Sequence, residues 1–209
     1  MIELIAFLGN PGKKYAETRH NAGRLLALAL PFYERLVWQN KYKGIYASID
    51  GKDVLSYAEG ENTAAAEKDI PHKIHFLMPE TYMNVSGESI HQAASFFKIP
   101  AERILLVHDE LELSLGFAAF KFSGGLGGHN GLRSMKTLFN TADFWRLRIG
   151  IGRPNHDDIS GWVLSNFTDE EKSDLRYVFS DCANALCRAL VYSPETLLPE
   201  WNKKKIKGA

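Results

Sequence analysis

Residues 2–12 read IELIAFLGNPG, and this stretch decides the fold. The mostly apolar run 2–8 predicts a buried β-strand, and Gly9-Asn10-Pro11-Gly12 is a strong turn signal that ends it. A second apolar run, ILLV at 104–107, is followed by His108-Asp109-Glu110. Ligands in open α/β sheets bind beyond the carboxyl ends of the strands. We therefore expect Asn10 and Asp109 to lie at one edge of a sheet.

Strand and helix patterns alternate along the rest of the chain, without an internal repeat or a linker. This alternation predicts one three-layer α/β domain with a mixed central sheet, residues 1–209. Asp50-Gly51 predicts a two-stranded turn within 44–57, and Pro31 should kink or divide a helix over 22–37. The other expected elements are strands at 75–79, 117–122 and 146–152, helices at 86–98, 130–139 and around 175–190, a loop or short helix at 59–71, and a polar, mobile loop at 153–160 that is a candidate lid.

Composition is that of an ordinary soluble protein. The chain has 209 residues, 45% hydrophobic and 24% charged, which is long enough for a real core. Because 25 Lys and Arg balance 25 Asp and Glu, the global charge predicts no partner. Cys182 and Cys187 fall on different faces of one helix, so we expect neither a disulfide nor a metal site. With no membrane-spanning run and no signal-like N-terminus, we expect a cytoplasmic protein.

His20 and Asp109 are candidates for acid–base chemistry. His20 lies between a loop and a helix start, where the helix dipole disfavours an imidazolium and suits a neutral base. A buried Asp109 could accept a hydrogen bond from the imidazole and fix its tautomer. Each residue alone is more often structural, His20 as a helix-start residue and Asp109 as a turn cap. Together they indicate hydrolysis of an acyl group by water.

Asn10, Asn84 and Asn130 supply neutral amides. An amide donates and accepts hydrogen bonds without titrating, which suits it to hold a carbonyl group or a water molecule. Each is also a common turn or cap residue, and Asn130 in particular could cap its helix. For any one of them the structural interpretation is favoured, but three near His20 and Asp109 favour a substrate-binding cleft.

The glycine loop 123–128 could present main-chain N–H groups to an anion ahead of a helix. It matches neither a P-loop nor a dinucleotide-binding fingerprint, and it could instead serve only tight packing. Lys121 before it and Arg148 on the next strand could hold a phosphate. The tail 201–209 is basic and could touch a nucleic-acid backbone, although such tails are more often frayed and solvated.

Six segments resemble, in order, the bacterial peptidyl-tRNA hydrolase family. They are GNPG (9–12) with Tyr15, TRHNAG (18–23), PETYMNVSG (79–87), HDEL (108–111), GGHNGL (127–132) and FWRLRIGIG (144–152). The resemblance implies a phosphorylase/hydrolase-like α/β sandwich that cleaves the ester between a peptide and the 3′ end of tRNA. It also implies a monomer that needs no metal and no organic cofactor.

The resemblance assigns roles residue by residue. His20 would be the general base, Asp109 would support its basic form, and Asn10 would tell blocked from free aminoacyl groups. Substrate contacts would come from Tyr15, Tyr82, Met83, Asn84 and Asn130, and a phosphate clamp from Lys121 and Arg148. Ala119 stands where relatives can have a lysine, which removes one phosphate contact.

Two alternatives stay open at this point. The first is a metal-dependent amidase or peptidase that uses His108, Asp109 and Glu110, although these lack the spacing of an HExxH site. The second is a non-catalytic RNA-binding module of the same fold. Retention of Asn10, His20, Asp109 and Asn130 favours the hydrolase over the RNA-binding module.

Overall fold

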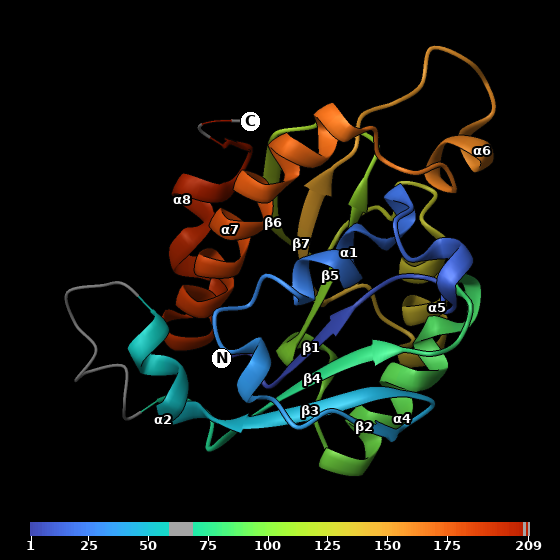
Figure 1. Cartoon of the computed structure of the whole chain (residues 1–209). Helices are drawn as coiled ribbons and strands as arrows, with labels where there is room; N and C mark the ends of the chain where they lie inside the picture. The colour runs from blue at the N-terminus through green and yellow to red at the C-terminus, as the bar shows by residue number, and fades with distance from the viewer. Residues whose placement is uncertain (59–68, 207, 209) are drawn as a thin grey trace.

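A mixed sheet forms the centre of the molecule (Figure 1). The computed structural model describes residues 1–58, 69–206 and 208, so part of the loop predicted at 59–71 lies outside the described residues. In the described part the sheet has the order β2-β3-β4-β1-β5-β7-β6-β8. The central strands are parallel: β1 (Leu4–Phe7), β4 (Lys73–Pro79), β5 (Ile104–Glu110) and β7 (Trp145–Gly150). The outer strands are antiparallel to their neighbours: β2 (Gln39–Lys41), β3 (Gly44–Asp50), β6 (Phe117–Phe122) and β8 (Lys204–Lys205).

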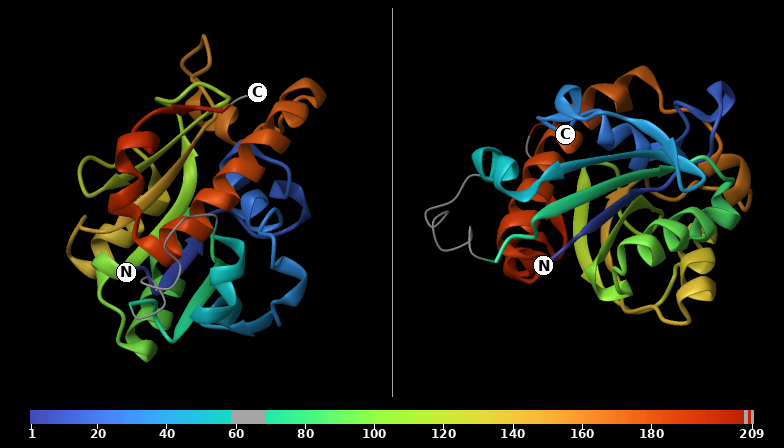
Figure 2. Two further views of the ribbon diagram at one scale, coloured as in Figure 1. Left: turned by 90° about the vertical axis from the view of Figure 1, so that its left-hand side faces the viewer. Right: turned by 90° about the horizontal axis from the view of Figure 1, so that it is seen from below.

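Helices cover both faces of this sheet (Figure 2). One face carries α4 (Ser86–Phe97) and α5 (Asn130–Phe139). The other carries α1 (Ala22–Ala27), α2 (Gly51–Val54), α7 (Asp169–Tyr192) and α8 (Leu198–Trp201). Side chains alternate along β5, so Leu105 and Val107 enter the core under α1 and α7, whereas Ile104 and Leu106 enter the core under α4 and α5. The prediction of a three-layer α/β sandwich with a mixed sheet is confirmed.

Two local predictions were wrong. The two strands predicted around Asp50-Gly51 are one strand, β3, followed directly by α2, because β3 pairs with β4 rather than with the residues after the turn. The helix predicted over 22–37 ends at Ala27, and only a short 3-10 turn, Tyr33–Arg35, follows. The alternative that Pro31 divides this segment is confirmed, because proline lacks an amide hydrogen and α1 and the 3-10 turn lie on either side of it.

The C-terminal tail is packed rather than frayed. Trp201 and Ile206 are 2% and 1% exposed and belong to the core under α7. Between them β8 pairs with β6, and the Ile206 N–H donates to the Gly116 carbonyl at 2.8 Å. Burial of these two apolar side chains is the physical reason that residues 201–206 are held, and for these residues it corrects the prediction of a frayed, solvated end.

The two cysteines lie in α7, buried and unpaired, as predicted. Burial raises the pKa of both thiols, to about 12 for Cys187. Within the described ranges no helix is both long and apolar enough to cross a membrane.

Candidate active site

A close approach of α1 to the sheet brings His20 to the carboxyl end of β5. A Cβ atom on Gly23 would lie 2.4 Å from the Val107 carbonyl oxygen and 2.7 Å from that of Leu8, so only glycine fits there. The preceding 3-10 turn, Arg19–Asn21, is thereby held against the strand ends. Sequence reasoning placed Asp109 after its strand, whereas β5 continues to Glu110 and Asp109 pairs in register with Ile149 of β7.

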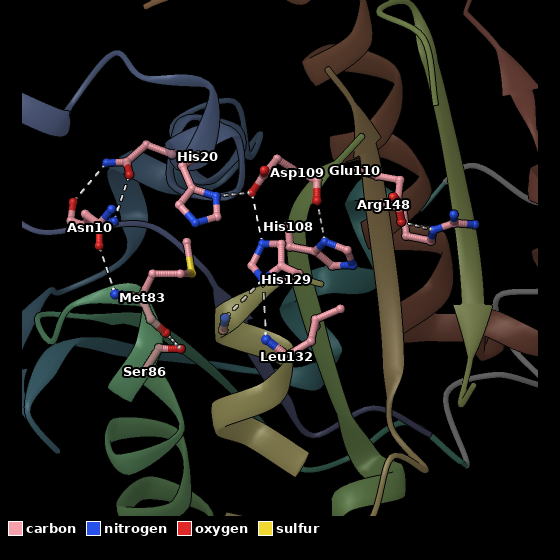
Figure 3. Close-up of polar contacts among 12 residues, drawn as sticks. Asn10, His20, Met83, Ser86, His108, Asp109, Glu110, His129, Leu132 and Arg148 are labelled. Carbon is pink, nitrogen blue, oxygen red and sulfur yellow. Dashed lines mark hydrogen bonds and ion pairs between the residues drawn. The ribbon is translucent and has the colours of Figure 1, made fainter. Parts of the chain in front are cut away.

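His20 and Asp109 form a buried pair (Figure 3). Nδ1 of His20 lies 2.9 Å from Oδ1 of Asp109, and the two residues are 8% and 3% exposed. An ionised carboxylate only accepts hydrogen bonds, so Nδ1 carries the proton and Nε2 keeps its lone pair. Burial lowers the pKa of His20, but the charge and hydrogen bond of Asp109 outweigh it, and the net pKa is raised above the ordinary 6.5. Sequence reasoning expected the helix dipole to disfavour the imidazolium and did not predict this rise of the pKa, although it did expect Asp109 to accept a hydrogen bond from the imidazole.

A second histidine, His129, donates to the same carboxylate oxygen. Its Nε2 lies 3.0 Å from Oδ1 of Asp109. Its Nδ1 accepts from the main-chain N–H groups of Gly131 and Leu132 at 3.1 and 3.4 Å, so His129 is the N-cap of α5. Because main-chain N–H groups can only donate, this imidazole is fixed with its proton on Nε2. Sequence reasoning missed His129 and considered Asn130 for the cap; its place just before the predicted helix was the available signal.

The histidine and carboxylate groups do not fit a metal site. The predicted trio His108, Asp109 and Glu110 is dispersed: the Glu110 carboxylate accepts from Arg148, and Nδ1 of His108 donates to the Asp109 carbonyl at 2.6 Å. His20, Asp109 and His129 do bring ligand atoms within 4.8 Å of one another. However, Nδ1 of His129 already accepts two N–H groups, so a metal on Nε2 would require an imidazolate.

Asn10 is held with one orientation of its amide. Its Oδ1 accepts from the Met83 N–H at 2.8 Å, so Nδ2 is the group left to donate. Its main chain is clamped by the Asn21 side chain, which accepts from the Asn10 N–H at 2.7 Å and donates to the Asn10 carbonyl at 3.0 Å. The motifs that contain Asn10, His20 and Met83 are therefore joined by hydrogen bonds (Figure 3). Sequence reasoning did not select Asn21.

A cavity of about 340 Å³ opens beside His20, Asp109 and His129. His20, Asp109 and His129 line its floor, and Asn130 borders both this cavity and a neighbouring hollow that Asn84 lines. The opposite wall includes Ile159 and Val163 of α6 (Ile159–Val163). The loop predicted at 153–160 thus turns into a helix, because the Asp158 carboxylate caps it by accepting from the Gly161 N–H at 2.7 Å.

Comparison with known proteins identifies this arrangement. The family model described as peptidyl-tRNA hydrolase matches residues 4–209. The chain is 43% identical to the peptidyl-tRNA hydrolase of Treponema pallidum, over 98% of this chain and 96% of the relative. It is 42% identical to that of Desulfitobacterium hafniense, over 81% and 83%.

The chain belongs to the peptidyl-tRNA hydrolase family. A crystal structure of the Acinetobacter baumannii peptidyl-tRNA hydrolase is also similar, with a TM-score of 0.76 at 35% identity over 95% of this chain and 91% of that one. A peptidyl-tRNA hydrolase complexed with N-propanol has a TM-score of 0.81 at 33% identity over 100% and 97%. The family predicted from the sequence, a family of tRNA ester hydrolases, is confirmed.

Seven residues that the family pattern selects lie outside the His20 cavity. Asn10 lines a separate hollow together with Asn21, Asn84 lines the hollow beside Asn130, and Met83 is 4% exposed. Tyr15 is half-buried in the turn Lys13–Tyr15, and Tyr82 is 60% exposed. Lys121 lies on β6, and Arg148 on β7 donates through Nε to Glu110 at 2.8 Å. These positions are compatible with contacts to a large substrate outside the cavity.

Two buried arginines that sequence reasoning missed organise the surroundings of this peptidyl-tRNA hydrolase site. Arg146 donates to the carbonyls of Gly124 and Gly125 at 2.9 and 2.7 Å, which fixes the glycine loop. Arg19, next to His20, pairs with Glu171 at 2.8 Å and stacks 3.7 Å from the ring centre of Trp162. It thereby joins the His20 turn to α6 and α7.

Proposed function

We propose that this chain hydrolyses the ester that links a peptide, or an N-blocked aminoacyl group, to the 3′ end of tRNA, and so recycles peptidyl-tRNA. The observation that carries the proposal is the 2.9 Å bond between Nδ1 of His20 and Asp109, which leaves Nε2 as a base at the cavity. Membership of the peptidyl-tRNA hydrolase family supports the choice of substrate.

His20 is the general base. Its Nε2 takes a proton from water as the oxygen attacks the ester carbonyl, and the imidazolium then returns the proton to the departing ribose oxygen. Asp109 stabilises the imidazolium. Burial raises the pKa of Asp109, but its two histidine partners outweigh this and hold the pKa far below its ordinary value, so the carboxylate stays charged. A metal is not needed, because an activated ester and a positioned base suffice.

Asn10 provides specificity and oxyanion stabilisation. With Oδ1 engaged by Met83, its free Nδ2 donates to a carbonyl oxygen of the substrate. A peptide carbonyl accepts this hydrogen bond, whereas the ammonium group of a free aminoacyl ester would face another donor. Asn84 and Asn130 hold the attacking water or the substrate, with Met83, Tyr15 and Tyr82 contacting the acyl and terminal nucleotide groups. Loss of one oxyanion donor typically costs about 10²–10³ in rate.

Lys121 and Arg148 bind an RNA phosphate. Only Nε of Arg148 donates to Glu110, which orients the guanidinium and leaves both Nη groups able to donate. In the described part of the chain, no carboxylate lies within ion-pair distance of the Lys121 ammonium. Loss of either cation should weaken tRNA binding more than it slows the chemical step.

We test this function by release of N-acetyl-amino acid from N-acetyl-aminoacyl-tRNA in the presence of EDTA. The wild type should turn over, His20→Ala should lose activity, and His72→Ala, an exposed histidine distant from the cavity, should not. Chelator-sensitive turnover would revive a metal mechanism. Tight tRNA binding without turnover by a folded wild type would leave only an RNA-binding module.

We further propose that residues 1–209 act as one domain, as a monomer and in the cytoplasm. A single continuous sheet spanning the described residues supports one domain, and two unpaired cysteines suit a reducing compartment. Light scattering coupled to gel filtration should give the mass of one chain, 23.5 kDa.

A further inference from the structure

The C-terminal strand β8 is the outermost strand of the sheet beyond β6. It lies at the level of the carboxyl ends of the central strands, where the active site is. It pairs with the start of β6, where Phe117 faces Lys205 and Ala118 faces Lys204. Ala118 in turn faces Ile149, which faces Asp109. The tail and Asp109 therefore lie in one row across the strands. Three strand spacings separate them, about 14 Å.

The register decides which lysines of the tail share a face with Lys121. Residues directly opposite in an antiparallel pair point to the same side, so Lys205 points with Phe117, Ala119 and Lys121. Continuing the register by one residue before the first residue of β8 brings Lys203 alongside Ala119. An independent contact agrees, since the Lys203 ammonium lies 5.6 Å from the centre of the Phe117 ring.

Lys204 points to the opposite face. Its ammonium pairs with Glu200 and lies 4.6 Å from the ring centre of Trp201. The three consecutive lysines are therefore not equivalent: the middle one anchors the tail, and its two neighbours are exposed beside β6.

The charge on this face comes from the tail and Lys121. On the same row as Lys203, Ala119 carries no charge and Arg148 is balanced by Glu110 at 2.8 Å. Among the described residues no carboxylate lies within ion-pair distance of Lys121, Lys203 or Lys205. A cationic surface thus runs outward along the sheet from the active-site edge, although the chain as a whole has no net charge.

We propose that Lys203 and Lys205 bind phosphates of the tRNA and continue the contact that Lys121 and Arg148 begin. Lys203 takes over from the cation that Ala119 does not supply. The occupant is the RNA backbone, because unpaired lysines on one face match a row of phosphates and because the row leads to the cavity for the 3′ end. This inference rests on the proposed function.

The test is the salt dependence of binding of deacylated tRNA, measured by fluorescence anisotropy. Lys203→Gln/Lys205→Gln is compared with Lys73→Gln/Lys98→Gln, which removes the same charge at the opposite edge, where β4 begins and α4 ends. For the tail variant, the slope of log K against log salt should decrease by about 0.7–0.9 per lysine. The Kd at 0.15 M salt should accordingly rise about four- to fivefold per lysine. The edge control should match the wild type.

Further variants separate charge from folding. Lys203→Arg/Lys205→Arg should keep the wild-type slope, and Lys205→Gln alone, at an exposed side chain, should show half the effect if the double variant does not fold. A wild-type slope in a folded Lys203→Gln/Lys205→Gln variant would overturn the inference while hydrolysis by the wild type still upheld the proposed function. Failure of the wild type to bind or cleave N-acetyl-aminoacyl-tRNA would overturn both.

Discussion

Asp109→Asn separates the charge of the Asp109 carboxylate, to which we assign a catalytic role, from its hydrogen-bonding geometry. Nδ1 of His20 and Nε2 of His129 both donate to the same oxygen, Oδ1, at 2.9 and 3.0 Å. Since His129 is fixed as a donor there, an asparagine has to turn its carbonyl oxygen toward both imidazoles and its NH₂ group away. The substitution should therefore keep the tautomer of His20 and remove only the negative charge.

The magnitude follows from the charge that develops on His20. In the transition state an imidazolium faces the carboxylate, with charge centres about 4 Å apart, which gives about 4 kcal/mol at an effective dielectric constant of 20. That free energy corresponds to about 10³ in rate. We expect kcat/KM for N-acetyl-aminoacyl-tRNA to fall by this factor at the optimal pH. Without the charge, burial dominates and the pKa of His20 should fall below 6.5.

The assay is the pH profile of kcat/KM between about pH 5 and pH 9, with Asp109→Ala as the comparison. The acidic limb should move to lower pH in Asp109→Asn, and Asp109→Ala should lose more activity because both imidazole N–H groups lose their acceptor. An acidic limb that stays in place or moves to higher pH would refute the role given to the charge. Equal activity of the two variants would refute the retained tautomer.

Three other predictions follow from the same contacts. Asn10→Asp should accelerate hydrolysis of free aminoacyl-tRNA relative to the N-acetylated ester, because a carboxylate oxygen can accept from the ammonium group; unchanged discrimination would contradict it. His129→Ala removes the α5 cap and should lower the free energy of unfolding in urea by about 1 kcal/mol, whereas His129→Asn should keep the cap. Both variants remove the hydrogen bond that His129 donates to Asp109, so both should raise the pKa of His20 in the pH–rate profile. The His20–Asp109 pair should stabilise the fold most between the unfolded pKa values of about 3.9 and 6.5: Asp109, with a lowered pKa, loses its contribution as pH falls, and His20, with a raised pKa, loses its contribution as pH rises. A difference in unfolding free energy between wild type and Asp109→Asn that does not vary with pH would contradict this window.

Local apolar patterns predicted the elements that line the core. The strands at 75–79 and 117–122 and the helices at 86–98 and 130–139 match β4, β6, α4 and α5 closely, because apolar spacing records which side chains enter the core. The short edge strands β2 and β8 consist of polar residues and have no such spacing. Their position depends on partners distant in the sequence.

The candidate site divides in the same way. Asn10, His20 and Asp109 were predicted because turns and buried runs mark them locally. His129 acts through a carboxylate twenty positions earlier, and Arg19 through Glu171, so their roles depend on contacts that only the folded chain creates. The substrate contacts of Tyr15, Tyr82, Lys121 and Arg148 stay predictions, since they depend on a partner molecule.

Main-chain N–H groups fix the orientation of two side chains in this site, Asn10 and His129. The Met83 N–H fixes which end of the Asn10 amide faces the substrate, and the N–H groups of Gly131 and Leu132 fix which nitrogen of His129 faces Asp109. A main-chain N–H cannot become an acceptor, so neither side chain can reverse without leaving a buried group unsatisfied, at about 1–3 kcal/mol. This fixed orientation also affects His20. Because His129 always donates to the Asp109 carboxylate, the carboxylate keeps one orientation toward the imidazolium that forms on His20. In the proposed mechanism, a pre-oriented base and a pre-oriented amide lower the reorganisation that the reaction would otherwise require, and they act together with the charge of Asp109.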